Sequence, residues 1–244
     1  MAIDGTSETS KLIITLVAAG GEDPRNFEEH DFVALLQKKQ REDGRYGEHI
    51  YTTNWAVMAL SAAGEDTSKG VAWLISQQNE DGGFGWTVGG AESDCDDTSS
   101  TVEALIAGGT PQDSPVIRDA VAFLKTMQQA DGGFNYGGSS ATNSASDSWV
   151  IQALVAAGED PLTWTTATGN TPVSHLLAFQ ADEGYFRWTS VLTDTPPCKM
   201  TATAVPALTG KPFPPVIPVK GAVPVAPPGT RGNASDNGNR STFC

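Results

Sequence analysis

The 244-residue sequence has few cysteines, few positive charges and no long apolar run, and each shortage excludes a class of protein. Its three cysteines (Cys95, Cys198 and Cys244) are too sparse for a disulfide framework, and no CxxC pair marks a structural zinc site. With 15 Lys and Arg against 29 Asp and Glu, the net charge is −14, so we expect no nucleic-acid partner. Because no run of about 20 apolar residues occurs, we expect no transmembrane segment.

The first residues, Met1 to Thr6, also lack the basic and apolar regions of a signal peptide. Taken alone, this predicts a cytoplasmic protein. The hydrophobic fraction of 39% is enough for a substantial core.

Internal repetition is the strongest feature of the sequence. A helix that ends in glutamine and runs into a Gly turn with an aromatic residue recurs at residues 32–47, 71–86, 121–136 and 176–188. A second helix, rich in Ala and Leu, recurs between these segments, at residues 9–20, 54–64, 100–108, 148–158 and 201–208. Polar N-cap residues precede these helices, and Gly ends most of them. The pattern predicts about nine helices that must stack to bury their apolar faces.

The turn-bearing helices resemble the QW repeat of squalene-hopene cyclases and their relatives. The best match is Trp73-Leu74, Gln78, Gly83 and Trp86, followed by Phe123-Leu124, Gln129, Gly133 and Tyr136, and more loosely by Leu36, Gln40, Gly44 and Tyr46. The resemblance covers about residues 6–213. It implies an α/α toroid with the Ala-rich helices inside, and it implies that each Gln caps a helix end beside a buried aromatic residue.

We therefore predict an all-α protein with two parts. Residues 1–211 form an α/α-toroid domain, partial or complete, built from helical-hairpin repeats. Residues 212–244 form an extended Pro-rich and polar tail, because proline prevents helix, and this tail carries glycosylation-type sequons at Asn233 and Asn239.

The segment Asp94-Cys95-Asp96-Asp97-Thr98 is the sharpest chemical candidate. It resembles the Asp-x-Asp-Asp-Thr motif of class II terpene cyclases, in which the middle acid protonates an alkene or epoxide. The resemblance implies that Asp96 is the proton donor and that Asp94 and Asp97 tune it, and clustered carboxylates do push pKa values apart. The structural alternative is that Asp97, Thr98 or Ser99 caps the following helix.

No other residues form a convincing site. The three histidines (His30, His49 and His175) lie in no evident partner motif, and residues 144–147 have the composition of a polar capping segment. Glu92 and Glu103 add hard oxygens near the acidic segment, but no calcium-loop spacing occurs. We therefore expect no metal ion and no cofactor.

Two functions stay open. Residues 21–27 and 204–213 resemble non-cyclase bacterial and archaeal prenyltransferase-repeat proteins, which predicts a non-catalytic toroid outside the cell or at its surface. Such a protein binds an apolar small molecule in its cavity, or self-associates through open repeat edges or the tail. The alternative is a class II terpene cyclase that uses Asp96. Only the enzyme requires an aromatic-lined cavity that opens onto Asp96.

Overall fold

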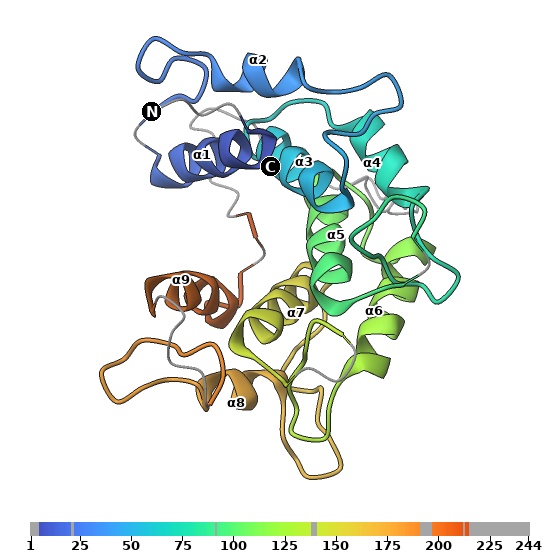
Figure 1. Cartoon of the computed structure of the whole chain (residues 1–244), viewed down its shortest axis with the longest axis vertical. Helices are drawn as coiled ribbons and strands as arrows, with labels where there is room; N and C mark the ends of the chain where they lie inside the picture. Colours follow the sequence, from blue (N-terminus) through green and yellow to red (C-terminus); the bar gives the residue numbers. More distant parts are fainter. Residues whose placement is uncertain are drawn as a thin grey trace, which may run out of the picture.

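The computed structural model describes residues 5–20, 22–90, 92–137, 141–190, 197–211 and 213–214. These residues form nine α-helices and no strand, which confirms the all-α prediction (Figure 1). Within the same ranges, no helix combines the length and the apolar character that crossing a bilayer requires. The expected tail, with both sequons and Cys244, lies outside the described residues except for residues 213 and 214.

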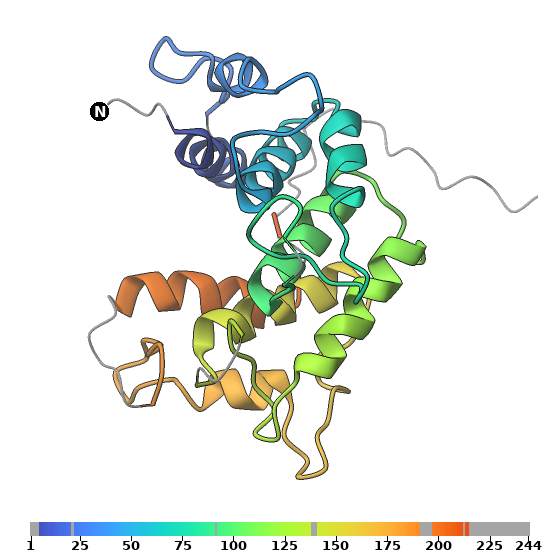
Figure 2. The same ribbon diagram turned by 45° about the vertical axis from the view of Figure 1, so that its right-hand side comes forward.

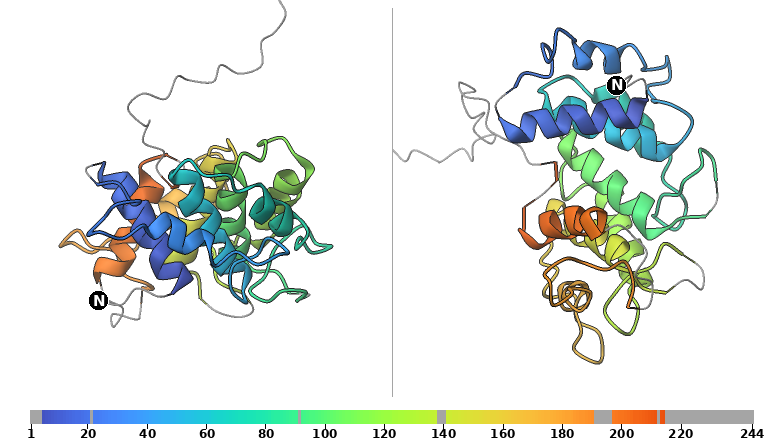
Figure 3. Two further views of the ribbon diagram at one scale, coloured as in Figure 1. Left: turned by 90° about the horizontal axis from the view of Figure 1, so that it is seen from above. Right: turned by 60° about the vertical axis from the view of Figure 1, so that its left-hand side comes forward.

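The helices form two layers. The inner layer contains α1 (Thr6–Ala19), α3 (Ile50–Ala62), α5 (Cys95–Ala107), α7 (Ser144–Ala156) and α9 (Pro197–Leu208), and each packs against the next in chain order. The outer layer contains α2 (Phe32–Gln37), α4 (Ser68–Ile75), α6 (Pro115–Met127) and α8 (Pro172–Leu177), which pack behind them (Figures 2 and 3). The inner helices therefore follow an arc from α1 to α9, as in an α/α toroid (Figure 1).

The two layers bury different surfaces because they have different numbers of neighbours. In the outer helix α6, the buried residues (Val116, Ile117, Ala120, Phe123 and Leu124) recur at the spacing of one helix face. The inner helix α5 buries 10 of its 13 residues, many of them Ser or Thr. Its small polar side chains bond to the neighbouring helix: the Asn54 amide nitrogen donates to Ser100 Oγ and Thr101 Oγ1, both at 2.9 Å.

The inner helices begin earlier than the sequence predicts, at residues 50, 95 and 144 instead of 54, 100 and 148. The polar residues expected as caps form the first helical turn, and most of them are buried. The prediction that Asp97, Thr98 or Ser99 caps α5 was therefore wrong. Asp94 is the N-cap, and its Oδ1 accepts the Asp97 backbone N–H at 2.8 Å.

Glutamines join the repeats as predicted, with one correction. Gln78 Nε2 donates to the carbonyl oxygens of Gly82 and Val116, both at 2.8 Å, so it links its own turn to α6. In the next repeat this role belongs to Gln128, which donates to the carbonyls of Gly132 and Trp164. The assignment to Gln129 was wrong, because the helix register places Gln128 five residues after Phe123, as Gln78 follows Trp73.

Tyr46, the last aromatic residue of the first turn, is buried as expected, but in the next two turns the last aromatic residue is not buried at the joint. Trp86 and Tyr136 are 41% and 50% exposed, whereas Phe84 and Phe134 have no exposed surface. The phenylalanines supply the apolar area that holds the turn, and the later aromatic residues turn toward the concave side of the arc, where they line a cavity.

Candidate functional site

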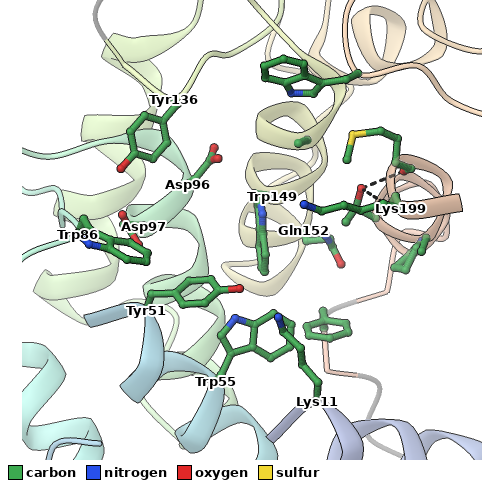
Figure 4. A pocket seen from close by; sticks show the side chains of 17 residues that line it. Lys11, Tyr51, Trp55, Trp86, Asp96, Asp97, Tyr136, Trp149, Gln152 and Lys199 are labelled. Atoms are coloured by element: carbon green, nitrogen blue, oxygen red, sulfur yellow. Dashed lines mark hydrogen bonds between the residues drawn. The ribbon is translucent and has the colours of Figure 1, made fainter. Parts of the chain in front are cut away.

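A cavity of about 700 Å³ occupies the concave side of the arc (Figure 4). Its wall contains seven aromatic residues, namely Tyr51, Trp55, Trp86, Tyr136, Trp149, Trp188 and Phe213. Trp55 is central among them, because its ring centroid lies 6.0 Å from each of the ring centroids of Tyr51, Trp149 and Phe213. The volume and the apolar lining are those of a small-molecule site.

Two of the predicted acids, Asp96 and Asp97, lie in the wall of this cavity. The preceding turn holds them there: the Asp94 backbone N–H donates to the Phe84 carbonyl at 3.0 Å, and the Phe84 N–H donates to Thr98 Oγ1 at 2.9 Å. Because the Phe84 ring is fully buried, the start of α5 is fixed against the turn. The structure thus brings Asp94, Asp96 and Asp97 together and directs two of them toward the cavity.

The three acids bind protons more tightly than ordinary aspartates. Burial, and then the charge of Asp97, raises the pKa of Asp94 to about 8, while burial raises the pKa of Asp97 to about 6. A hydrogen bond between the two side chains lowers the pKa of Asp97 and raises that of Asp94, so Asp94 keeps the proton that they share.

Asp96 is separate from this pair. Burial raises its pKa to about 6, and a hydrogen bond with Ser146 limits the rise. Its Oδ1 is buried and has no hydrogen-bond partner among the described residues. Tyr136 lies nearby in the cavity wall, and burial and the acids raise its pKa to about 12, so its hydroxyl stays protonated (Figure 4). Asp96 can therefore present a proton to an apolar molecule near neutral pH.

Two lysines complete the cavity, and neither was predicted from the sequence. Lys11 of α1 and Lys199 of α9 lie in its wall, away from Asp96 (Figure 4). The Lys11 Nζ is 4.8 Å from the ring centroid of Trp55. Among the described residues, neither amine forms an ion pair with a carboxylate. The only signal in the sequence was that each is the one basic residue of an otherwise uncharged or acidic inner helix.

The other acid and thiol of α5 face the protein interior. Burial raises the pKa of Glu103 well above its usual value, and neither of its carboxyl oxygens has a described hydrogen-bond partner, so it is neutral. Burial and the flanking acids raise the pKa of Cys95, which is therefore a thiol. Among the described residues, no three His, Cys, Asp or Glu side chains are grouped closely enough to hold a metal ion.

Two family models match successive parts of this chain. Residues 2–99 match the family model of the squalene-hopene cyclase C-terminal domain, and residues 109–208 match that of the prenyltransferase alpha-alpha toroid domain. A 61-residue segment is 44% identical to the drimenyl diphosphate synthase of Streptantibioticus cattleyicolor. That segment is 25% of this chain and only 12% of the synthase.

Solved structures show the same fold at low sequence identity. The chain matches Candida albicans protein geranylgeranyltransferase-I complexed with GGPP with a TM-score of 0.53 and 17% identity, over 68% of this chain and 50% of that one. It matches a protein from Actinoplanes with a TM-score of 0.56 and 16% identity, over 84% of this chain and 61% of that one. A glycosidase is similar at a TM-score of 0.56 and 14% identity, over 85% of this chain and 68% of the glycosidase.

The two family models together account for residues 2–208 except 100–108. Successive parts of the chain thus match two family models, that of the squalene-hopene cyclase C-terminal domain and that of the prenyltransferase alpha-alpha toroid domain.

Proposed function

We propose that this chain is the acid-bearing toroid of a class II terpene cyclase, in which Asp96 protonates an alkene of an isoprenoid. The observation that carries the proposal is the position of Asp96 in the wall of a cavity lined mainly by aromatic rings. The segment identical at 44% of positions to a drimenyl diphosphate synthase supports the same reaction class. The non-catalytic alternative does not require this arrangement.

The reaction begins with a proton transfer. The alkene π electrons form a new C–H bond with the Asp96 proton, which leaves the Asp96 carboxylate and a tertiary carbocation. A second alkene of the same chain attacks the cation and closes a ring, and loss of a proton ends the reaction. The faces of Trp55, Trp86 and Trp149 stabilise the positive charge, and the apolar wall keeps water away from it.

The charges of the cavity indicate how the substrate lies. Asp96 is on one side, and Lys11 and Lys199 lie away from it (Figure 4). An isoprenoid with an anionic head fits this distribution, because the head pairs with the amines while the far alkene reaches Asp96. A prenyl diphosphate has this chemistry, whereas squalene offers the lysines no partner.

Incubation with a prenyl diphosphate and, separately, with squalene tests the proposal. Products are released by phosphatase where needed and identified by mass spectrometry, for the wild type and for Asp96→Asn. We expect a cyclic product from the diphosphate with the wild type and none with the variant. A folded wild-type protein that binds the diphosphate but forms no product contradicts the proposal.

A non-catalytic toroid that binds an apolar ligand is the second candidate. The observation in its favour is the same cavity, because an apolar lining binds an apolar molecule whether or not Asp96 reacts. The expected location at the cell surface belongs to this candidate. It predicts ligand binding that Asp96→Asn leaves unchanged, with the ligand recovered unaltered.

A further inference from the structure

The two ends of the inner arc lack a neighbour on one side. Among the described residues, α3, α5 and α7 each pack between two inner helices, whereas α1 packs against α3 and α9 packs against α7. Figure 1 shows α1 and α9 on opposite sides of the opening of the arc. One side of α1 therefore has no inner helix packed along it.

A groove of about 520 Å³ lies along this side of α1, and we call it the α1 groove. Five residues from one face of α1 and two aromatic residues line it, namely Lys11, Ile14, Thr15, Ala18, Ala19, Trp55 and Phe213. Thr15, Ala18 and Ala19 are exposed, so the helix face that forms the groove is open in the described part of the chain. Apart from Lys11 and Thr15, the lining is apolar.

The chain returns to this groove after α9. That helix ends at Leu208, and five residues later Phe213 packs against Trp55 of α3, with their ring centroids 6.0 Å apart. Lys11, Trp55 and Phe213 line both the α1 groove and the main cavity, so the two share a wall. The residues from 215 onward, which the structure does not describe, therefore follow directly from the wall of the groove.

The sequence of the next residues suits an apolar groove. Residues 215–219 are Pro-Val-Ile-Pro-Val, and the first charge after them is Lys220. Proline disfavours helix and favours the extended polyproline II form, which rises about 3.1 Å per residue. Because α1 rises about 10 Å from Lys11 to Ala18, three or four residues of this form span the groove. Grooves lined by aromatic residues bind proline-rich segments in this form.

We propose that residues 215–219 occupy the α1 groove of their own chain as an extended strap, which closes the arc between α1 and α9. The strap also covers the end of the main cavity at Lys11 and Trp55, and it excludes water there. Attachment favours this occupant over a second copy. A segment tethered at the wall of the groove has a local concentration on the order of millimolar, far above that of another copy in dilute solution.

Two tryptic sites in the tail test the proposal on the full-length chain. Lys220 and Arg231 both precede glycine, and only Lys220 adjoins the strap. Trypsin needs several extended residues on both sides of the bond, so it cleaves after Lys220 only when the strap has left the groove. Mass spectrometry of the first C-terminal fragments, 221–244 and 232–244, gives the two rates. We expect cleavage after Lys220 to be about tenfold slower than after Arg231 in the wild type.

Two double variants release the strap from opposite sides. Val216→Ser with Ile217→Ser removes the apolar side chains of the strap, and Thr15→Gln with Ala18→Gln places polar side chains in the groove. Thr15 and Ala18 are exposed, so the second variant keeps the core of the protein, which the unfolding temperature verifies. We expect each variant to raise the rate of cleavage after Lys220, relative to Arg231, by about tenfold.

Val223→Ser with Val225→Ser is the matched control, because these residues lie beyond the groove, and it should leave the ratio of rates unchanged. An unchanged ratio in both release variants overturns the proposal. A wild-type ratio that rises on dilution also overturns it, because the groove then holds the segment of a second copy. None of these measurements requires turnover, so the strap is tested independently of the proposed role of Asp96.

Discussion

Replacing Gln78 by methionine tests whether the glutamines hold the repeats together. Methionine keeps the length of the side chain but has no donor, so the hydrogen bonds to the carbonyls of Gly82 and Val116 are lost. A net hydrogen bond contributes about 1 kcal/mol, so we expect Gln78→Met to lower the free energy of unfolding by about 2 kcal/mol. Urea unfolding followed by circular dichroism measures this difference.

Gln77→Met is the matched control. The side chain of the adjacent Gln77 donates to the Ser76 hydroxyl and to no other described residue, so the same substitution is expected to cost less than about 0.5 kcal/mol. Equal losses in the two variants, or no loss in Gln78→Met, would refute the argument that this glutamine ties α4 to α6 across the repeat.

Three further predictions concern the cavity and its acids. Product formation should fall about tenfold per pH unit above the pKa of about 6 of Asp96, because only protonated Asp96 reacts; a rate that is flat from pH 6 to 8 would contradict this. Glu103 has a raised pKa in the folded protein, so the native state holds a proton that the unfolded chain releases, and the Glu103 contribution to stability falls as pH rises above about 4.3. Glu103→Gln should therefore match the wild type near pH 4 and unfold at a higher temperature than the wild type at pH 8, and an equal difference at both pH values would exclude this explanation. Lys11→Met and Lys199→Met should each weaken binding of a prenyl diphosphate by about fivefold in calorimetry and leave binding of a neutral isoprenoid unchanged. Equal losses of affinity for both ligands would show that the lysines do not bind the anionic head group.

The fold was predictable because each helix has its own local sequence pattern and these patterns repeat along the chain. Each Ala-rich and each glutamine-ended segment predicted one helix, and the order of segments predicted the alternation of inner and outer layers. The first turns were missed because Thr53, Ser99 and Ser100 are polar, and polarity near a helix start is typical of caps. Their helical state depends on burial by neighbouring repeats, as in the bond from Asn54 to Ser100, which a single segment does not reveal.

The acids of the site were predictable from their motif, but their surroundings were not. Trp55 and Trp149 are 94 residues apart in the sequence. Only the arc of the inner helices brings their rings together. No sequence motif marked a partner for His175, because its partner Asp147 is 28 residues away. Aligning the repeats would have revealed this pair, because His175 stands where Phe123 stands and Asp147 where Thr98 stands.

The origin of the proton is the most direct test of the proposed mechanism. A prenyl diphosphate is incubated with the wild type in D2O, and the product is compared by mass spectrometry with the product formed in H2O. The account predicts a cyclic product that carries one deuterium on a carbon of the isoprenoid chain, and no such product from Asp96→Asn. A cyclic product without deuterium, or one that Asp96→Asn still forms at the wild-type rate, would contradict the assignment of Asp96 as the acid.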